Sequence, residues 1–411
     1  MRKLKFGVIG LGQRGSSVTK GTLAKLDDVE LVAICDFYED RVESMAKTLE
    51  EISGKKPIVF TNHHELLKLE LDAVYVSSSW DTHLEISIDA MNAGIAVAME
   101  VGGAYNLDSL WNLVHTQEKT GTPLMLMENC CFDKHELLAT SMVRNGLLGE
   151  IVHGHGCYAH CLQEQIASGH IKRHYRLDNY LKRNCENYPT HELGPIAKVL
   201  NVNRGNRMIS LVSVSSKAVG METYIKDHEE QYPELVGKKF QQGDIVNTLI
   251  TCADGSTISL RLDTTLPRFY AREFTLHGTK GIYEQNNNIV YLEGDPEGGW
   301  AYDHMRKYHD NAEQYEEKYL PSVWKNLSED QLNTGHGGMD AIQWIEFIKA
   351  LRNGSEMPID VYDAASWMAI TAISEQSIAL GGAPQPIPDF TSGRWVTRKP
   401  MDVTEMPNVL D

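Results

Sequence analysis

Three side chains capable of acid–base chemistry, Tyr188, Thr190 and His191, lie close together in the segment NYPTHELGPI. Pro189 fixes its own φ angle and disfavours helical backbone at Tyr188, so we expect a stiff, non-helical turn before a helix that begins at Glu192. An imidazole titrates near neutral pH, and a phenol can relay protons where its surroundings lower its pKa. The segment therefore predicts either a proton-transferring substrate site or a simple turn in which Thr190 caps the helix.

Other polar and aromatic residues of this half of the chain have plain interpretations when each is taken alone. Tyr158 in GCYAH is typical of strand packing, and Arg176 in the charged stretch HIKRHYRLDNYLKRN is typical of a solvated face. The segment HGHGCYAHC places His153 and His155 on one strand face and His160 on the other. Because no further ligand set matches them, we expect no metal site.

The elements that would position these groups begin with a nucleotide-binding pattern at the N-terminus. A buried strand, LKFGVIG, runs into GLGQRG, in which Gly10, Gly12 and Gly15 match the dinucleotide fingerprint. A helix is expected over about residues 14–26, with its N-terminus facing the phosphates. The next strand ends at Asp36, where an acid holds a ribose diol and favours NAD over NADP.

The alternation of strands and helices continues to the sixth strand, TPLMLME. This order predicts a doubly wound parallel sheet of the Rossmann type. Ligands of such sheets bind at the carboxyl ends of the strands. The residues expected there are Gly10–Gly15, Asp36, Ser77–His83, Glu100–Gly103 and Glu128–Asn129.

The pattern changes after residue 130, which divides the chain into a nucleotide-binding domain (1–130) and a second domain (131–411). Strands dominate the second domain, and CADGST is a strong two-residue hairpin signal. Two late helices follow, MDAIQWIEFIKALRNG and YDAASWMAITAISEQSIALGG. We expect an α+β domain with an open, mainly antiparallel sheet.

Composition limits the classes of partner. The 411 residues carry a net charge of -17, which argues against nucleic acid and anionic membrane surfaces. No apolar run is long enough to span a bilayer, and MRKLKFGVIG enters the first strand without a signal-peptide pattern. Seven cysteines without metal spacing suggest reduced thiols. We expect a cytoplasmic protein that acts on a small molecule or glycan.

A nucleotide-binding domain followed by an open antiparallel sheet resembles the Gfo/Idh/MocA oxidoreductases. Dehydrogenases of that group carry Glu-Lys-Pro with a catalytic lysine after the fifth strand, whereas this chain has Glu100-Val101-Gly102-Gly103. That departure, together with GLGQRG, MENCC, MVRNGLLGEIVH, YPTHELGP, NVNRG and GHGGMD, resembles glycoside hydrolase family 109. The chain differs from the family pattern at Glu192, where glycine is expected. The resemblance implies an NAD-dependent α-N-acetylgalactosaminidase, and a homo-oligomer is implied by resemblance only.

The resemblance also assigns site residues by matching motif. The glycines aside, it implies cofactor contacts from Gln13, Arg14, Asp36, Trp80, Asp81, Thr82, His83, Glu100, Val101 and Asn129. It implies sugar contacts from Tyr158, Arg176, Tyr188, Pro189, Thr190, His191 and Tyr270. Of these, His191, Tyr188 and Tyr158 are the candidate catalytic residues, and we expect His191 and Tyr188 beside the nicotinamide.

The chemistry implied by the resemblance is a redox-neutral cycle that needs no carboxylate pair. NAD takes hydride from C3 of the sugar, a base removes the acidified C2 proton, and the C1 substituent leaves. Water then adds at C1 and the hydride returns. Two alternatives stay open: a sugar or polyol dehydrogenase that releases NADH, and an inactive NAD-binding scaffold or sensor. The absent lysine argues against the first, and the tyrosine–histidine set against the second.

Overall fold

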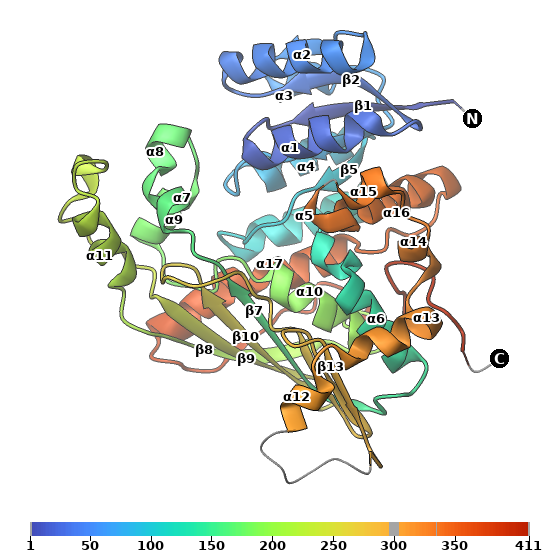
Figure 1. Cartoon of the computed structure of the whole chain (residues 1–411). Helices are drawn as coiled ribbons and strands as arrows, with labels where there is room; N and C mark the ends of the chain where they lie inside the picture. Colours follow the sequence, from blue (N-terminus) through green and yellow to red (C-terminus); the bar gives the residue numbers. More distant parts are fainter. Residues whose placement is uncertain (1, 296–303, 334, 410–411) are drawn as a thin grey trace. The chain divides into compact units, whose positions relative to one another are not determined.

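A computed structural model describes residues 2–295, 304–333 and 335–409 (Figure 1). The chain forms two compact units. The first comprises Met1–Phe132 and Asn326–Ala365, and the second comprises Asp133–Lys325 and Ser366–Asp411. The segment Asn326–Ala365, which the sequence places after the nucleotide-binding domain, therefore belongs to the same compact unit as that domain.

The first unit is built on a six-stranded parallel sheet in the order β3-β2-β1-β4-β5-β6. This is the expected doubly wound arrangement, and it confirms the predicted fold class. The strands at the middle of the sheet are buried on both faces because helices cover both, so they read as continuous apolar runs. The strands are β1 (Leu4–Ile9), β2 (Val29–Cys35), β3 (Ile58–Phe60), β4 (Ala73–Val76), β5 (Ala96–Met99) and β6 (Leu124–Leu126).

The helices of this unit follow the predicted alternation, with shorter bounds in two places. The helix expected over residues 14–26 ends at Gly21 and gives way to a 3-10 turn over Leu23–Lys25. The helix expected at HHELLKLE is the single turn His63–Leu66. The helices are α1 (Gln13–Gly21), α2 (Glu39–Ser53), α3 (His63–Leu66), α4 (His83–Asn92), α5 (Leu107–Thr120), α15 (Glu329–Leu332) and α16 (Met339–Asn353).

Aromatic packing explains why α16 belongs to the first unit. Trp344 and Phe347 are fully buried, and their ring centroids lie 6.2 and 6.1 Å from that of Phe6 on β1. Trp344 also meets Tyr75 on β4 edge to face at 5.3 Å. A helix distant in sequence thus completes one face of the parallel sheet, which apolar periodicity alone does not reveal.

The second unit contains an eight-stranded, mainly antiparallel sheet in the order β13-β12-β11-β7-β10-β9-β8-β14. One neighbouring pair, β7 and β10, is parallel, so the sheet is mixed rather than purely antiparallel. The predicted hairpin at CADGST joins β9 to β10 in antiparallel register. The strands are β7 (Ile151–Ala159), β8 (Met208–Ser215), β9 (Ile245–Cys252), β10 (Thr257–Asp263), β11 (Thr275–Gly278), β12 (Gly281–Glu284), β13 (Ile289–Leu292) and β14 (Gln385–Pro386).

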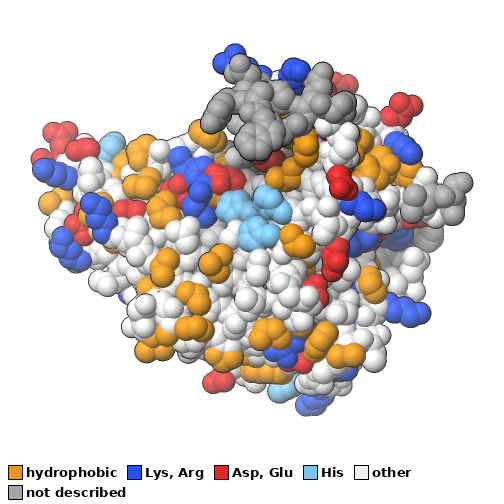
Figure 2. All heavy atoms as spheres, turned by 90° about the horizontal axis from the view of Figure 1, so that it is seen from below, with side chains coloured by type: hydrophobic (Ala, Val, Ile, Leu, Met, Phe, Trp, Pro, Cys, Tyr) orange, Lys and Arg blue, Asp and Glu red, His pale blue; other side chains and the backbone are white. Residues whose placement is uncertain are grey.

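Helices cover one face of this sheet and leave the other open. In Figure 1, α10 (Thr190–Val199) and α17 (Val361–Ala379) lie above β7–β10. Figure 2 shows the molecule from below the view of Figure 1, with a compact group of histidine side chains and scattered hydrophobic side chains on the surface. The other helices of this unit are α6 (Lys134–Arg144), α7 (Gln163–Ala167), α8 (Gly169–Lys172), α9 (Arg176–Lys182), α11 (Gly220–Asp227), α12 (His304–Tyr308), α13 (Glu316–Tyr319) and α14 (Ser322–Lys325). No helix among the described residues has the length and hydropathy needed to cross a membrane.

Candidate active site

The glycine turn after β1 has the geometry of a dinucleotide cradle. Gly10 adopts φ +100°, and a Cβ there would lie 2.5 Å from the backbone of Ser77 and Ser78 at the end of β4. A Cβ on Gly15 would collide with the carbonyl oxygen of Gly10, so only glycine allows α1 to approach β1 this closely. At Gly12 the nearest atom to an added Cβ is 3.8 Å away, which leaves the open approach that a pyrophosphate needs.

Asp36 lies directly after β2, where the sequence predicted the ribose-binding acid. Its side chain is buried and accepts hydrogen bonds from the backbone N–H groups of Leu11 (2.6 Å) and Tyr38 (2.9 Å). Its Oδ2 also lies 3.7 Å from the Arg41 guanidinium. The carboxylate therefore ties the glycine turn to the end of β2, which gives Asp36 a structural role besides any cofactor contact.

The loop after β4 and the loop after β5 fit together. Trp80 and His83 are buried, and a Cβ on Gly102 would lie 2.5 Å from Trp80 and 2.7 Å from His83. A bulkier residue at Gly102, such as the proline of Glu-Lys-Pro, would clash with this loop. The two departures from the dehydrogenase pattern, Trp80–His83 and Val101–Gly103, are therefore sterically linked. In the same loop, Asp81 accepts a hydrogen bond from Ser79, and the Thr82 hydroxyl donates to the Ser79 carbonyl at 3.2 Å.

His83 is held as a neutral imidazole. It is fully buried, and burial lowers its pKa to about 4. Neither ring nitrogen has a hydrogen-bond partner among the described residues, and the same holds for the buried Ser78 hydroxyl. Buried polar atoms are normally satisfied. Unsatisfied groups beside the glycine cradle fit a site whose ligand supplies the missing partners, which is the requirement for a bound dinucleotide.

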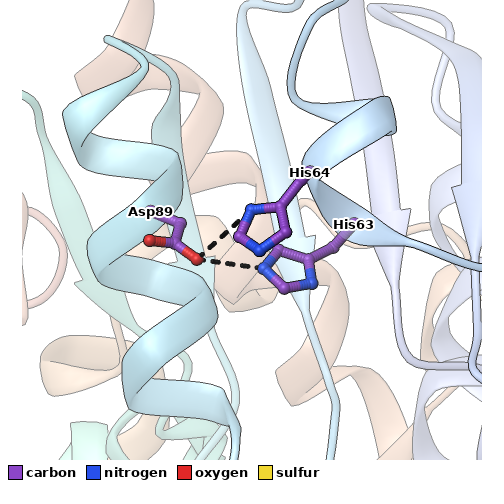
Figure 3. Close-up of side chains that lie close together, drawn as sticks. All are labelled: His63, His64 and Asp89. Atoms are coloured by element: carbon purple, nitrogen blue, oxygen red, sulfur yellow. Dashed lines mark hydrogen bonds and ion pairs between the residues drawn. The ribbon is translucent and has the colours of Figure 1, made fainter.

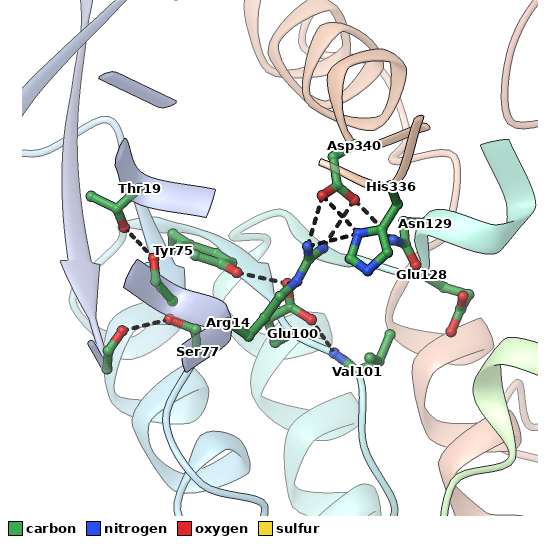
Figure 4. A network of polar contacts seen from close by, with 12 residues as sticks. Arg14, Thr19, Tyr75, Ser77, Glu100, Val101, Glu128, Asn129, His336 and Asp340 are labelled. Carbon is green, nitrogen blue, oxygen red and sulfur yellow. Dashed lines mark hydrogen bonds and ion pairs between the residues drawn. The ribbon is translucent and has the colours of Figure 1, made fainter. Parts of the chain in front are cut away.

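A partly buried ion-pair and hydrogen-bond network connects four of the predicted cofactor residues (Figure 4). Arg14 on α1 contacts Glu100 at 2.9 Å and Asp340 at 2.7 and 3.0 Å. The Asn129 amide donates to Asp340 at 2.8 Å. Glu100 also accepts from the Tyr75 hydroxyl at 2.6 Å and from the N–H of Val101 at 3.2 Å, the latter through its other carboxylate oxygen.

Asp340, His336 and Tyr75 are the members of this network that were not predicted from the sequence. His336 Nδ1 lies 3.1 Å from Asp340 Oδ2. Burial opposes ionisation of Asp340, but its contacts with His336 and Arg14 hold the pKa of this carboxyl well below its usual range. His336 and Asp340 both lie in the motif GHGGMD, which the sequence analysis used only to recognise the family because it is not a known cofactor-binding pattern.

Gln13, which was also predicted to contact the cofactor, is the first residue of α1.

The second unit brings the predicted catalytic residues into one aromatic cluster. The rings of Tyr158 and Tyr188 lie 4.5 Å apart, centroid to centroid. His191 meets Tyr188 edge to face at 4.8 Å and Tyr158 at 5.6 Å. Strand β7 carries Tyr158, whereas Tyr188 and His191 flank the start of α10. Three groups capable of proton transfer therefore share one small region.

Arg176 belongs to this cluster and not to a solvated face. It is the first residue of α9 and is buried, with its guanidinium carbon 5.1 Å from the centre of the Tyr188 ring. Burial disfavours the charge, yet the surrounding phenols, Tyr158 among them, raise the pKa of Arg176 above its ordinary value. A permanent positive charge thus lies against two tyrosine rings, where it stabilises negative charge on a phenol or on a bound polar group.

Tyr270 lies at the exposed edge of the cluster and is linked to it through His160. The Tyr270 side chain is 48% exposed, and its ring meets that of His160 edge to face at 5.3 Å. His160 in turn lies 6.2 Å from Tyr158. Burial, together with the charge of Arg176, lowers the pKa of His160 below its ordinary value. From the sequence, His160 was considered only as a possible metal ligand, and its position beside Tyr158 and Tyr270 was not predicted.

The helix that carries His191 begins two residues earlier than predicted, so Thr190 and His191 lie in its first turn, whereas Tyr188 precedes the helix as predicted. Helix α10 begins at Thr190, and Pro189 at its N-cap has helical angles of φ -69° and ψ -21°. The N–H of Leu193 donates to the Pro189 carbonyl at 2.9 Å. Proline suits a helix start because the first turn needs no N–H donor. Thr190 is fully buried in the first turn and does not cap the helix.

Glu192, the residue found where the family pattern has glycine, anchors α10 to the sheet. Its Oε2 accepts hydrogen bonds from the backbone N–H groups of Tyr158 (2.9 Å) and Arg261 (3.1 Å) on the parallel strands β7 and β10. The close approach depends on Gly156, where a Cβ would lie 2.5 Å from the Glu192 carbonyl oxygen. Glu192 therefore fixes the backbone position of Tyr158.

Glu186 lies against Glu192 in the buried interior. Both carboxyls are fully buried and interact with each other. Burial raises the pKa of Glu186 to about 8. Burial, followed by the neighbouring Glu186, raises the pKa of Glu192 well above its usual range. At neutral pH the pair retains bound protons that exposed carboxyls would have lost.

This pair predicts a specific pH dependence of stability. A group whose folded-state pKa is raised binds its proton more tightly when folded, so its stabilisation is present below the unfolded pKa and is lost as pH rises through the folded pKa. For Glu186 that window runs from about 4.5 to about 8. Between these pH values the free energy of unfolding of the wild type should fall relative to that of Glu186→Gln. The slope is at most about 1.4 kcal/mol per pH unit for each proton. Glu164→Gln, an exposed acid in the same unit, is the control.

The difference between wild type and Glu186→Gln, from denaturant titrations at several pH values, is the quantity to measure. It cancels the opposing effect of His83, whose lowered pKa reduces stability as pH falls below about 6.5. If the free energy of unfolding depends on pH in the same way in wild type and Glu186→Gln, the pKa of Glu186 is not raised in the folded protein.

Comparison with known proteins first defines the class. Residues 4–127 match the family description "Oxidoreductase family, NAD-binding Rossmann fold". Levoglucosan dehydrogenase, solved with NADH and levoglucosan, shares the fold with a TM-score of 0.69 at 17% identity, covering 94% of this chain and all of that one. Myo-inositol 2-dehydrogenase from Lactobacillus plantarum gives 0.65 at 16% identity, over 94% of this chain and 100% of the other. The chain thus has a domain that matches the NAD-binding Rossmann family description, and it shares its overall fold with these two dehydrogenases.

The second unit defines the family more narrowly. Residues 132–397 match "Glycosyl hydrolase 109, C-terminal domain". An alpha-N-acetylgalactosaminidase of Tannerella forsythia is 35% identical over 97% of this chain and 88% of its own length. A glycosyl hydrolase family 109 protein of Parabacteroides distasonis is 36% identical over 97% of this chain and 89% of its own. The chain belongs to glycosyl hydrolase family 109, as the sequence motifs predicted.

Proposed function

We propose that this protein hydrolyses α-linked N-acetylgalactosamine by a redox-neutral, NAD-dependent cycle. The observation that carries the proposal is the cluster of Tyr158, Tyr188, His191 and Arg176 in a chain whose relatives are named alpha-N-acetylgalactosaminidases. Such a cycle replaces the carboxylate pair of ordinary glycosidases. It requires a dinucleotide and groups that move protons at the sugar, and the chain has candidates for both.

The dinucleotide is held by residues of the first unit. The glycine turn of Gly10, Gly12 and Gly15 receives the pyrophosphate, and Asp36 receives the ribose diol, which favours NAD over NADP. His83 and Ser78 supply unsatisfied polar atoms beside it. When bound, NAD accepts a hydride from C3 of the sugar and returns it at the end of the cycle. Because the cofactor is regenerated in place, we expect it to stay bound through purification.

The sugar is held and deprotonated by the aromatic cluster. His191 and Tyr188, adjacent at 4.8 Å, take and return protons at the C3 hydroxyl and at C2. Tyr158, fixed by the hydrogen bond from its N–H to Glu192, extends the same proton path. Arg176 binds a polar group of the sugar and stabilises negative charge as the C2 proton leaves. Pro189, Thr190 and Tyr270 complete the proposed sugar contacts.

One assay tests this function. Purified protein is incubated with 4-nitrophenyl α-N-acetylgalactosaminide, with and without added NAD, while nitrophenol and NADH absorbance are recorded together. We expect nitrophenol with no net NADH. Net NADH formation with a free sugar or polyol would support the dehydrogenase function found among the structural neighbours. Release of neither product would favour an inactive NAD-binding scaffold.

The open face of the second sheet is the proposed contact between copies of the chain. Its strands expose Leu249, Val214, Val152 and Ile209, which are 59%, 51%, 49% and 40% exposed. Exposed apolar side chains on an uncovered sheet commonly mark a protein–protein interface, although polar side chains lie among them here. The seven cysteines form no disulfides, which fits the reducing cytoplasm proposed as its location.

Leu249→Arg tests this interface. It should convert the homo-oligomer to a smaller species in size-exclusion chromatography with light scattering, because a buried charge without a partner is costly at an interface. Ile52→Arg is the control, since Ile52 is similarly apolar and 44% exposed but lies on α2 of the first unit. A wild-type protein that is already monomeric, or an unchanged Leu249→Arg assembly, would refute the interface.

A further inference from the structure

His63, His64 and Asp89 form a compact cluster in the first unit that none of the proposed cofactor residues joins (Figure 3). His63 and His64 open the short helix α3, where the Asn62 side chain caps the His64 N–H at 3.0 Å. Asp89 projects from α4. Asp89 Oδ2 lies 3.0 Å from His63 Nε2 and 3.6 Å from His64 Nδ1.

The spacing of these three atoms suits a tetrahedral divalent cation. Zinc bonds to histidine nitrogen and carboxylate oxygen at about 2.0–2.1 Å, which places neighbouring ligand atoms of a tetrahedron about 3.3 Å apart. The two observed nitrogen–oxygen distances, 3.0 and 3.6 Å, lie on either side of that value. All three ligand atoms lie within 4.8 Å of one another. Small movements of the His63 and His64 side chains would therefore bring their nitrogens and the Asp89 oxygen to bonding distance from one cation.

We propose that His63, His64 and Asp89 bind a zinc-class divalent cation that joins α3 to α4. Two imidazole nitrogens and one carboxylate oxygen are ligands that zinc accepts readily, whereas calcium and magnesium prefer oxygen alone. The His64 side chain is 60% exposed, and those of His63 and Asp89 are 22% and 30% exposed. Solvent thus reaches the cluster and can supply the fourth ligand, so the bound ion exchanges with free metal.

The bound ion would stabilise a segment that is weakly held by its own backbone. Helix α3 has only four residues, and isolated turns of this length are unstable. The ring centroids of His63 and His64 lie 4.0 Å apart, and each ring has a nitrogen within 3.6 Å of Asp89 Oδ2. A cation that binds only the folded arrangement stabilises it by mass action. The proposed role is therefore structural and independent of the glycosidase site.

Zinc titration of the full-length protein tests this proposal. After treatment with a chelator, wild type should bind one equivalent in calorimetric titration, and zinc should raise its melting temperature. His63→Ala, His64→Ala and Asp89→Asn should each weaken binding at least about tenfold and abolish the thermal shift. His115→Ala, which removes an imidazole stacked on Trp111 of α5, should behave as wild type.

Cobalt as the probe distinguishes this cluster from cysteine sites elsewhere in the chain. Cobalt at His63, His64 and Asp89 should give visible bands without thiolate charge-transfer absorption. Equal zinc affinity in wild type and His63→Ala, or a cobalt spectrum with thiolate bands, would overturn the assignment. Absence of any zinc-dependent thermal shift in wild type would show that the cluster is only a histidine–carboxylate ion pair.

Discussion

Replacing His191 with alanine should reduce glycosidase turnover by about 100-fold or more, the usual contribution of a positioned acid–base group. The imidazole lies 4.8 Å from the Tyr188 ring and 5.6 Å from the Tyr158 ring, so its loss removes the group that joins both phenols. NAD affinity should stay near that of wild type, because every proposed cofactor residue lies in the first unit. Turnover of the nitrophenyl glycoside and calorimetric titration with NAD measure the two effects.

Two further variants make this prediction specific. His170→Ala removes an exposed imidazole on α8 of the same unit and should leave turnover unchanged. Tyr188→Phe keeps the ring that packs against Arg176 but removes its hydroxyl, so it should also slow turnover without lowering the melting temperature appreciably. Full activity of His191→Ala would reassign His191 to a structural role in the first turn of α10. The same conclusion would follow if the variant lost activity only because it unfolds.

Replacing Asp36 with alanine should weaken NAD binding by about tenfold or more, the scale of a lost hydrogen bond to a charged group. The same change should reduce discrimination against NADP, because the carboxylate would no longer repel the extra phosphate. Asp36 also accepts hydrogen bonds from the N–H groups of Leu11 and Tyr38, so alanine removes structural contacts as well. NAD and NADP titrations of the cofactor-free protein give both affinities.

Asp36→Asn separates the charge from the structural contacts. Asparagine carries no charge and keeps an acceptor for one of the two backbone N–H groups, because Leu11 and Tyr38 donate to different oxygens of the carboxylate. It should therefore lower the melting temperature less than alanine does, while NAD and NADP affinities move toward each other. Arg41, whose guanidinium lies 3.7 Å from Asp36, would then attract a 2′-phosphate without competition from that carboxylate. Unchanged selectivity in Asp36→Asn would remove the carboxylate from the ribose site.

The parallel sheet was predictable because its signals are local. The glycine fingerprint, the acid after β2 and the alternation of strands with amphipathic helices each lie within a short window of sequence. The membership of α16 in the same unit was not predictable in this way. Its contacts with Phe6 and Tyr75 join residues far apart in the chain, and only the tertiary structure brings them together.

Motif matching predicted residues that the structure brings close together, but it did not predict their geometry. Motif matching named Tyr158, Tyr188 and His191, and the structure brings them into contact. Composition suggested a solvated Arg176, because a run of charges does not show which member faces inward. Proline at residue 189 suggested a turn, although proline is equally suited to begin a helix.

The structural roles of two residues, Asp340 in the ion-pair network and Glu192 in the second unit, were not predicted from the sequence. Asp340 is more than 300 positions from Arg14, its ion-pair partner, and no periodic pattern links them. Glu192 appeared only as a departure from a family glycine. Its hydrogen bonds to β7 and β10 depend on Gly156, and the sequence alone does not show that this glycine faces α10.

The most direct test of the proposed reaction is the deuterium content at C2 of the sugar released in heavy water. Removal of the C2 proton by a cluster residue, followed by its replacement during water addition, requires that released N-acetylgalactosamine carry deuterium at C2. Mass spectrometry or NMR of the product measures it. The oxidation–elimination cycle predicts deuterium at C2 in the product, with no label in His191→Ala beyond its residual turnover. Full-rate hydrolysis by wild type that yields sugar without deuterium at C2 would contradict it.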